Sequence, residues 1–299
     1  MISILIPVFN VNVQSLVQEL SNQLKTLKVG AEIRVYDDYS DDSFKSQNNT
    51  ITSLAKVFYK ELDENLGRTA IRQLLAKEAQ YDWLLFIDSD STIINKNYLH
   101  YYLLAIDGGY DVYAGGRIYQ AEEPADCNKR LHWKYGTERE SIQGSKNVLH
   151  SNNFCIRKTV FLQLQFPAQL TGYGHEDTWM ELALIKAQQK IQFIDNPVLH
   201  SGLEDSTVFL EKTRSAVKNL LLLPKFFGEE TVKKKVRLYR LFYWQHKLGL
   251  HKMYTSFLNK RIRKIEENLQ SCNPSLLQFD LYRLYILFRI TQLPFTKRM

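Results

Sequence analysis

The sequence predicts an α/β fold: a Rossmann-like, mainly parallel central sheet flanked by helices, followed by a mostly helical basic extension. The apolar run Trp83–Ile87 is typical of a strand that is buried on both faces. Strand-like and helical patterns alternate before it, as in successive βαβ units. This alternation stops near Ser206, where helical patterns take over. We therefore expect two parts, residues 1–205 and residues 206–299.

The expected elements follow from hydrophobic periodicity. Ile2–Val8 has the pattern of a buried first strand, and Val13–Leu27 places its apolar residues on one helical face. The following elements are strands over Glu32–Tyr36, Lys56–Tyr59 and Leu84–Ile87, with a helix over Arg68–Ala79. Later elements are strands over Asp111–Gly116, Val148–Ile156 and Ile191–Ile194, a helix over Glu176–Gln188 and an extended segment at Pro197–His200.

Acidic side chains follow the predicted strands. The strand at Leu84–Ile87 runs directly into Asp88, Ser89 and Asp90. Open α/β sheets bind their ligands at the carboxyl ends of the strands, and two carboxylates at positions i and i+2 can converge on one divalent cation. The alternative is a strand end at which one Asp caps the next helix. Asp41 and Asp42, after the second strand, are interpreted as capping or solvated acids.

Composition indicates an ordinary globular chain, with 44% hydrophobic and 24% charged residues. Cys127, Cys155 and Cys272 are odd in number and have no paired spacing, so we expect no disulfide or zinc site and a reducing compartment. The N-terminus lacks the pattern of a signal peptide, and no apolar run is long enough to span a bilayer. These features favour a cytoplasmic location.

Charge is distributed unevenly along the chain. The overall net charge is +7, but residues 206–299 carry 19 Lys and Arg against 6 Asp and Glu, a net charge of +13. The basic segments include Lys233–Gly249, Lys260–Lys264 and Leu276–Leu293, which have the pattern of amphipathic helices. Such helices favour association with an anionic membrane surface, here on its inner face. The alternative is a helical subdomain that packs on the catalytic body. Nucleic-acid binding is not expected, since no known nucleic-acid-binding motif is present.

Several motifs together resemble family 2 glycosyltransferases, which use nucleotide sugars and have the GT-A fold. They are SILIPVFN, VYDDYSDDS, ENLGRTAIRQ, FIDSDS, SNNFCIRKTVF and GYGHEDTW, followed by a late His200. The resemblance spans residues 1–205, and residues 206–299 contribute nothing to it. It implies a nucleotide-diphosphate sugar donor, with UDP as the usual carrier, and a glycan or lipid-linked glycan acceptor.

The resemblance also implies roles for individual residues. Those that bind the donor would be Pro7, Val8 and Asn10 around the base, Asp38 as a hydrogen-bond acceptor from the base, Arg72 near the donor, and Asp88 and Ser89 near the ribose. Arg72 departs from the family's Ala-Arg-Asn, because its neighbours are Ile71 and Gln73. Asp90, with Asp88 and His200, would hold Mn²⁺ or Mg²⁺. Asp177, beside Glu176, matches the catalytic base.

These roles suit sugar transfer. A divalent cation at Asp90 would neutralise the charge that develops on the leaving diphosphate. Asp177, which follows the glycine-containing loop Gly172–Gly174, would remove the proton of the acceptor hydroxyl. One base opposite the leaving group predicts a direct displacement with inversion at the anomeric carbon. A nucleotidyltransferase and an inert nucleotide-sugar-binding scaffold remain alternatives.

Each assignment has a structural alternative. Asp177 would also be favourable as a negative charge at a helix N-terminus. His200 would serve equally as a buried structural histidine, and His175 is interpreted as a loop residue. Trp133 and Trp179 suit either sugar stacking or core packing. Gly115 and Gly116 suit either close approach to the donor or a turn.

Overall fold

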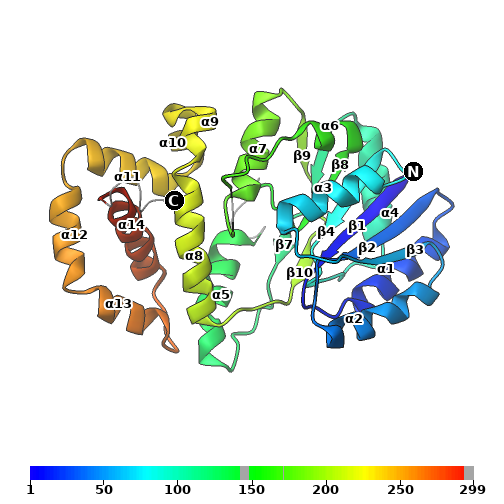
Figure 1. Ribbon diagram of the computed structural model, residues 1–299, viewed down its shortest axis with the longest axis horizontal. Helices are drawn as coiled ribbons and strands as arrows, with labels where there is room; N and C mark the ends of the chain where they lie inside the picture. Colours follow the sequence, from blue (N-terminus) through cyan, green and yellow to red (C-terminus); the bar gives the residue numbers. More distant parts are fainter. Residues whose placement is uncertain (142–147, 171, 293–299) are drawn as a thin grey trace. The chain divides into compact units, whose positions relative to one another are not determined.

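The computed structural model describes residues 1–141, 148–170 and 172–292, and Figure 1 shows its elements. The chain divides into two compact units. Unit 1 consists of Met1–Ala121, Thr137–Phe166 and Met180–Gly202. Unit 2 consists of Glu122–Gly136, Pro167–Trp179 and the described residues from Leu203 onward. Two short segments that precede residue 205 thus belong with the helical unit.

Unit 1 is built on a seven-stranded sheet in the order β3-β2-β1-β4-β8-β6-β9. Its strands are β1 (Ile2–Val8), β2 (Ala31–Asp37), β3 (Val57–Glu61), β4 (Trp83–Ile87), β6 (Val112–Ala114), β8 (Asn153–Arg157) and β9 (Ile191–Phe193). Strand β8 runs antiparallel to both of its neighbours, and the other pairs are parallel. The sheet is therefore mainly parallel, which confirms the predicted class.

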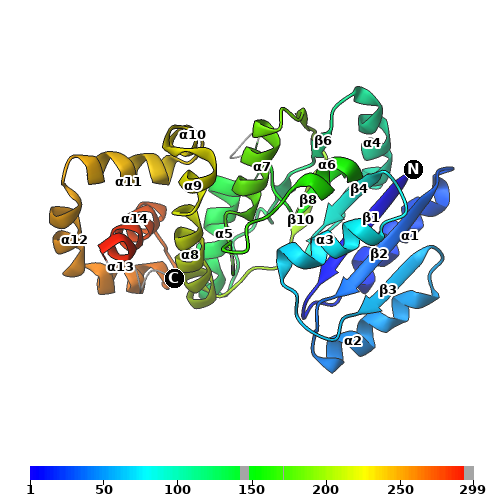
Figure 2. The same ribbon diagram turned by 45° about the horizontal axis from the view of Figure 1, so that its top comes forward.

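Helices cover both faces of this sheet, which explains why β4 is apolar throughout and β1 nearly so (Figure 2). The helices of unit 1 are α1 (Gln14–Thr26), α2 (Asp42–Asn48), α3 (Arg68–Glu78), α4 (Tyr98–Ala105), α6 (Lys158–Gln163) and the short η1 (Asn49–Ser53), η2 (Ile106–Gly108) and η4 (Gly136–Glu140). Helices α1 and α4 pack on one face in a continuous apolar core. On the other face Phe86 contacts Phe154 and Phe161, with ring centroids 4.9 and 4.6 Å apart.

A smaller sheet has three strands in the order β5-β10-β7, and its strand β5 follows β4 closely in the sequence. It comprises β5 (Ser91–Thr92), β7 (Arg117–Ile118) and β10 (Val198–His200). Strand β10 pairs antiparallel with β5 and parallel with β7, and His200 stands opposite Ser91. This sheet therefore ties the acidic turn after β4 to a strand more than a hundred residues later.

A buried amide organises the middle of unit 1. The Oδ1 of Asn153 accepts hydrogen bonds from the hydroxyls of Tyr98 (2.6 Å) and Tyr102 (2.7 Å), and its Nδ2 donates to the carbonyls of Gly116 (2.8 Å) and Asn196 (2.9 Å). All four hydrogen-bonding positions of a fully buried carboxamide are therefore used. The side chains of Tyr102 and Asn153 fill the space next to Gly115, so this glycine serves packing, whereas Gly116 has a left-handed backbone (φ 75°).

Unit 2 is helical in the part of the chain that the structure describes. Its elements are η3 (Cys127–Lys129), α5 (Arg130–Tyr135), α8 (Ser206–Leu220), α9 (Leu223–Phe227), α10 (Glu229–Lys235), α11 (Arg237–Lys247), α12 (His251–Asn259), α13 (Ile262–Leu269) and α14 (Leu276–Gln292). Helix α7 (Glu176–Lys186) begins in unit 2 and ends in unit 1. Figure 2 shows α14 enclosed by α8, α11, α12 and α13. None of the described helices is both long and apolar enough to cross a bilayer.

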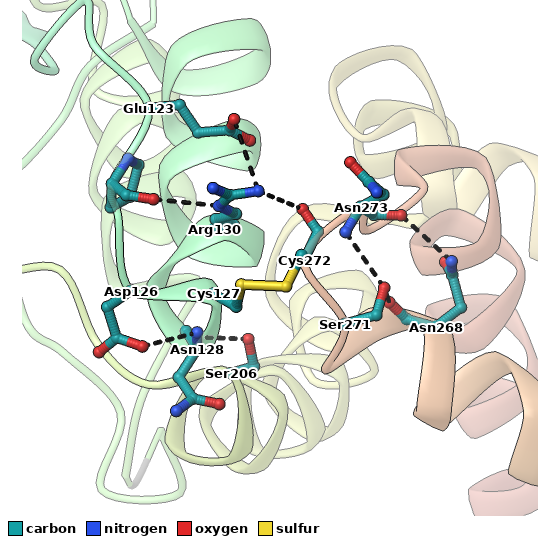
Figure 3. Close-up of a disulfide and its surroundings, with 11 residues drawn as sticks. Glu123, Asp126, Cys127, Asn128, Arg130, Ser206, Asn268, Ser271, Cys272 and Asn273 are labelled. Atoms are coloured by element: carbon teal, nitrogen blue, oxygen red, sulfur yellow. Dashed lines mark hydrogen bonds and ion pairs between the residues drawn. A yellow bond between two sulfur atoms is a disulfide. The ribbon is translucent and has the colours of Figure 1, made fainter.

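A disulfide within unit 2 contradicts the expectation of three free thiols. Cys127 and Cys272, 145 residues apart, are bonded, and only Cys155 remains a free, buried thiol (Figure 3). Beside the bond, Arg130 donates to the Cys272 carbonyl (2.9 Å). Sequence spacing could not show this pair, because the packing of two distant helical segments brings the cysteines together. The disulfide also removes the argument for a reducing compartment.

Most expected elements differ from the structure by one or two residues at an end, and two differ more. Strand β8 begins only at Asn153, because the residues from Val148 to Asn152 form no strand. The helix expected over Lys233–Gly249 is divided at Val236, whose backbone is extended (φ −110°, ψ 105°), into α10 and α11. The last residue of the helix expected over Leu276–Leu293 lies outside the described residues.

Candidate active site

Three strands of the large sheet end at one edge. Val8, at the end of β1, stands opposite Asp37 at the end of β2, and β4 lies on the other side of β1 and ends at Ile87. Because these strands are parallel, the residues that follow them emerge at the same edge, where α/β sheets bind ligands. The structure thus brings together the segments around Asn10, Asp38 and Asp88.

The loops after β1 and β2 are joined by hydrogen bonds. The backbone N–H of Asn10 donates to Ser40 Oγ (2.8 Å), and the Asn10 Oδ1 accepts from the N–H of Asp41 (2.8 Å). Asn10 has a left-handed backbone (φ 53°), which asparagine tolerates better than most residues. Pro7 is partly exposed and Val8 is buried, and the Val8 carbonyl accepts from the N–H of Asp38 (2.7 Å). The segment expected to face the base is therefore held by its backbone.

Asp38 is buried and bound by the polypeptide itself. Its two carboxylate oxygens accept the N–H groups of Leu66 (2.7 Å) and Gly67 (2.9 Å), in the loop before α3. Burial raises the pKa of Asp38 above its ordinary value, and neighbouring Asp37 adds to this, while the two backbone donors oppose it. Each oxygen keeps a further lone pair. A hydrogen bond from the nucleotide base stays a prediction for this residue.

The turn after β4 is fixed by its backbone and by Arg72. The N–H of Asp88 donates to the carbonyl of Asn152 (3.0 Å), and the carbonyl of Asp88 accepts the N–H of Ser91 (3.1 Å). The Asp88 carboxylate forms an ion pair with Arg72, which lies on α3 and is 8% exposed. Arg72 therefore reaches the acidic turn, even though its sequence neighbours differ from the family pattern. Its place near the donor stays a prediction.

Asp90 and His200 meet on the small sheet. The Asp90 Oδ1 lies 3.4 Å from His200 Nδ1, and the backbone carbonyl of Asp90 accepts the N–H (3.0 Å) and the hydroxyl (2.8 Å) of Ser201. Burial alone would raise the pKa of Asp90, but His200, then Arg117 and Arg68, outweigh it and hold that pKa below its ordinary value. Asp90 is therefore ionised at neutral pH.

Several residues around Asp90 carry no signal that sequence reasoning used. Arg117 lies on β7, contacts His150 Nδ1 (2.9 Å) and pairs with Glu140 (3.4 Å). The hydroxyl of Tyr119 donates to Glu140 (2.6 Å), and its ring contacts His200 edge-on. These residues are scattered in the sequence, and the pairing of β7 with β10 places Arg117 near the strand that carries His200. Arg68 and Arg117 supply positive charge at a site proposed for phosphates.

Gly202 lies directly against Asp90. A Cβ at this position would come within 2.7 Å of Asp90 Oδ2 and 2.9 Å of its Cβ. We expect Gly202→Ala to push the carboxylate away from His200 and to lower metal-dependent activity at least about tenfold while the protein stays folded. The control is Gly108→Ala, where a Cβ would make only ordinary contacts, 3.4 Å or longer. Equal activity of the two variants would show that the position of Asp90 is not critical.

Glu176 and Asp177 occupy the first turn of α7, in unit 2. The loop before them is packed on α8: the N–H of Tyr173 donates to Ser215 Oγ (3.1 Å), and Asn219 Nδ2 donates to the Gly174 carbonyl (2.9 Å). Gly174 has a left-handed backbone (φ 98°), and a Cβ there would lie 2.8 Å from Ala216 Cα. Helix α8, which lies in the extension outside the resemblance, therefore positions the loop that carries the expected base.

His175, at the end of this loop, is a neutral imidazole. Burial lowers its pKa to about 4, the charge of Arg283 acts in the same direction, and Asp177 opposes it. Its Nδ1 lies 3.1 Å from Thr178 Oγ1, so the loop interpretation holds, with a side chain that is only partly exposed. Trp179, four residues on, is 6% exposed and contacts Phe227, which supports core packing for this tryptophan.

The pKa of His175 predicts a pH effect on stability. Between pH 6.5 and 4 the unfolded chain binds a proton at this residue and the native protein does not, so the free energy of unfolding falls as the pH falls through this range. The full effect is about 3 kcal/mol, at about 1.4 kcal/mol per pKa unit. Urea unfolding at pH 7 and pH 4.5 measures it, and His175→Gln should lose less stability than the wild type. An equal loss in both would contradict a neutral His175.

The donor atoms at the edge suit a divalent cation, although the described residues contain no group of three or more His, Cys, Asp or Glu side chains placed to hold one. A carboxylate and an imidazole 3.4 Å apart are ligands that Mn²⁺ accepts. Mg²⁺ is commonly held by one or two carboxylates, with substrate phosphates and water completing the shell. Asp90 and His200 therefore fit the cation, whereas Asp88 is turned to Arg72 in this structure.

Comparisons with known proteins agree with this architecture. Two solved structures are similar: a mannosyltransferase from Pyrobaculum calidifontis in complex with GDP-Man and Mn²⁺ (11% identity, 98% of this chain and 88% of that chain, TM-score 0.55), and glucosyl-3-phosphoglycerate synthase from Mycobacterium tuberculosis in complex with Mn²⁺, UDP and glucosyl-3-phosphoglycerate (12% identity, 76% and 80%, TM-score 0.54). At these identities the likeness shows the fold. No curated protein matches the chain.

The family itself is shown by a family model. Residues 3–164, more than half of the chain, match the model described as Glycosyl transferase family 2. This range includes the two hydrogen-bonded loops that contain Asn10 and Asp38, Arg72 on α3, and the acidic turn Asp88–Asp90. The chain therefore belongs to glycosyl transferase family 2 and has the GT-A fold.

Proposed function

We propose that this protein is an inverting, metal-dependent glycosyltransferase that moves a sugar from a nucleotide diphosphate, in the first place a UDP-sugar, to a hydroxyl group. The observation that carries the proposal is the position of Asp90. It follows a central parallel strand, it is held next to His200 at 3.4 Å, and its pKa is kept low by the surrounding cations. At neutral pH such a carboxylate can bind a divalent cation, and the cation can in turn bind the diphosphate.

Residues of the three strand ends would bind the donor. Asn10 and Asp38 belong to the two hydrogen-bonded loops and would hold the base and ribose, together with the backbone of Pro7 and Val8. Ser89 and Asp88 would lie near the ribose, and Arg72, paired with Asp88, would lie near the phosphates. Mn²⁺ or Mg²⁺ on Asp90 and His200 would neutralise the charge that develops on the diphosphate. Arg68 and Arg117 support the same role, because they already act on Asp90.

Asp177 would serve as the general base, with Glu176 beside it. As the C–O bond between sugar and diphosphate breaks, the acceptor oxygen bonds to the anomeric carbon from the opposite face, and its proton passes to Asp177. One displacement inverts the anomeric configuration, which NMR of the product would show. The support is the location of Asp177 in the first turn of a helix, after a loop that Ser215 and Asn219 hold in place.

The acceptor we propose is a hydroxyl of a glycan or a lipid-linked glycan. The support is the charge of residues 206–299, a net +13, which favours an anionic membrane surface near which such acceptors lie. A cytoplasmic enzyme that is peripheral on the inner face of the membrane fits this arrangement. The Cys127–Cys272 disulfide is a feature more usual of oxidising compartments, and labelling of the purified protein with a thiol reagent before and after reduction tests whether it is formed.

Nucleotide binding tests the proposal without knowledge of the acceptor. Calorimetric titration with UDP, dTDP and GDP, each with Mn²⁺ and with EDTA, should show that one diphosphate binds and that chelation weakens it at least about tenfold. The matching nucleoside monophosphate is the control, since it lacks the diphosphate that the cation bridges. Binding that is unchanged by chelation, or no binding of any diphosphate, would contradict a metal-dependent donor site.

A further inference from the structure

Helices α11 and α12 expose two apolar stripes. On α11 the stripe consists of Leu241, Trp244 and Leu248, which are 47%, 49% and 67% exposed. The stripe that leads into α12 consists of Leu250, Met253 and Phe257, which are 40%, 68% and 54% exposed. Both stripes have the spacing i, i+3, i+7 of a single helical face. We call these six residues the α11–α12 stripe.

These side chains are not needed for the core of unit 2, because the opposite sides of the same helices supply it. Phe242 on α11 contacts Phe288 on α14, with ring centroids 5.2 Å apart, and Tyr254 on α12 contacts the same ring at 5.6 Å. Tyr239 and Leu258 are buried as well. The two helices are thus apolar on two sides, and Figure 1 shows them bordering α14.

Exposed apolar side chains are clustered in the stripe, whereas single exposed apolar side chains scattered over a protein surface are normal. Of the nineteen large apolar side chains that are exposed in the described residues, six lie within the seventeen residues from Leu241 to Phe257. The two halves meet at the turn Leu248–Leu250. There the N–H of Gly249 donates to His246 O (3.0 Å) and that of Leu250 donates to Gln245 O (3.0 Å), so a hydrogen-bonded turn joins them.

Positive charge surrounds the stripe. Residues 231–265 contain eleven Lys and Arg and no Asp or Glu. The exposed cations on α11, on α12 and just after it are Arg237, Arg240, Lys247, Lys252, Lys260 and Arg261. Two of them lie over exposed rings of the stripe: the Arg261 guanidinium is 3.8 Å from the Phe257 ring centre, and Lys247 Nζ is 5.4 Å from that of Trp244. Each half of the stripe therefore has a cation directly beside one of its exposed rings.

We infer that the α11–α12 stripe docks this protein on an anionic phospholipid bilayer. The apolar side chains would enter the boundary between headgroups and acyl chains, and the surrounding Lys and Arg would contact lipid phosphates. Two copies of the chain are a poorer match, because equally charged faces repel. Nucleic acid would use the charge but leave the Leu, Met and Phe side chains without an apolar partner. Only a bilayer matches both features.

The docking rests on the membrane association proposed above and assigns it to particular side chains, but it is tested apart from sugar transfer, because vesicle binding needs neither donor nor acceptor. Full-length protein is mixed with vesicles of pure phosphatidylcholine and with vesicles that contain phosphatidylglycerol. We expect binding to the anionic vesicles and at least about tenfold weaker binding to the neutral ones, with a decrease as salt is raised. The triple variant Trp244→Ala, Met253→Ala, Phe257→Ala should bind the anionic vesicles at least about tenfold more weakly than the wild type.

The matched control is Leu277→Ala on α14, which removes an equally exposed apolar side chain (70%) outside the stripe and should leave binding unchanged. If the triple variant is unstable, brominated lipids provide a second test. They should quench the tryptophan fluorescence of the wild type and quench Trp244→Phe much less, since only a residue in the bilayer is reached. Wild-type binding that the triple variant retains, or no binding to anionic vesicles, would overturn the inference. So would a dimer or a complex with nucleic acid that the variant abolishes while vesicle binding is absent.

Discussion

Replacing Asp90 with alanine is expected to lower the rate of sugar transfer at least about a hundredfold, the scale on which removal of one stabilising group at a developing charge is felt. Asp90 is the carboxylate that lies beside His200 and whose pKa is held below its ordinary value. Its loss would take away the main cation ligand and leave the charge on the leaving diphosphate uncompensated. Initial rates at saturating donor, with Mn²⁺ titrated over a wide range, measure the effect.

The control for Asp90 is Asp42→Asn, because the Asp42 carboxylate also follows a strand end of unit 1 but is fully exposed. This variant should keep wild-type activity. Thermal unfolding of both proteins separates a local effect from misfolding. Because Asp90 is ion-paired, its variant should lose some stability as well as activity. A folded Asp90→Ala protein with wild-type rates and an unchanged dependence on Mn²⁺ would remove Asp90 from the metal site.

Replacing Asp177 with asparagine is expected to lower the turnover number for transfer by about 10²- to 10⁴-fold, the usual contribution of a general base. The change keeps the size of the side chain and removes its capacity to accept a proton. Donor affinity should stay within about twofold, because the residues proposed to bind the donor are elsewhere in the chain. Rapid-quench turnover together with calorimetric donor binding measures both quantities.

Glu211→Gln on α8 is a suitable companion variant. Glu211 is an exposed acid in unit 2, and its substitution removes the same charge as Asp177→Asn. A comparable loss of activity in this variant would indicate a general electrostatic effect. Asp177→Asn with unchanged turnover would leave only the structural role of a negative charge at the start of α7. A loss of donor binding together with turnover would place Asp177 at the donor instead.

The sequence predicts the sheet well because the information is local there. The runs Ile2–Val8 and Trp83–Ile87 are apolar at every position but Ser3 and Pro7, and the structure places both as central strands. The first has the predicted bounds, and the second begins one residue before the predicted Leu84. Their parallel arrangement follows from the βα alternation. The acidic turn after Ile87 could also be read directly, since a strand end defines where its side chains emerge.

The surroundings of Asp90 could not be predicted in the same way, because they depend on pairing between distant segments. Residues Arg117, Tyr119 and His150 have no common motif. Arg117 lies on β7 of the small sheet and acts on Asp90, while Tyr119 contacts His200 and His150 contacts Arg117. The bond between Cys127 and Cys272 has the same origin. His200 was predicted from the resemblance, and its contact with Asp90 follows from the register that sets it opposite Ser91.

The sequence motifs also could not predict that α8 supports the Tyr173–Gly174 loop. Residues 206–299 contribute nothing to the family resemblance, so sequence reasoning treated them as an appended extension. In the structure Ser215, Ala216 and Asn219 contact the loop before Asp177. Contacts of this kind are set by the fold, and hydrophobic periodicity predicts only that a helix is present.

Donor turnover measured with the purified protein tests the central claim most directly. Panels of UDP-, dTDP- and GDP-sugars are incubated with Mn²⁺, with Mg²⁺ and with EDTA, both for the wild type and for Asp90→Ala, and the released nucleotide is quantified. The account predicts release from one donor that requires the cation and that Asp90→Ala abolishes. Release that continues at the same rate in EDTA and in Asp90→Ala would contradict it.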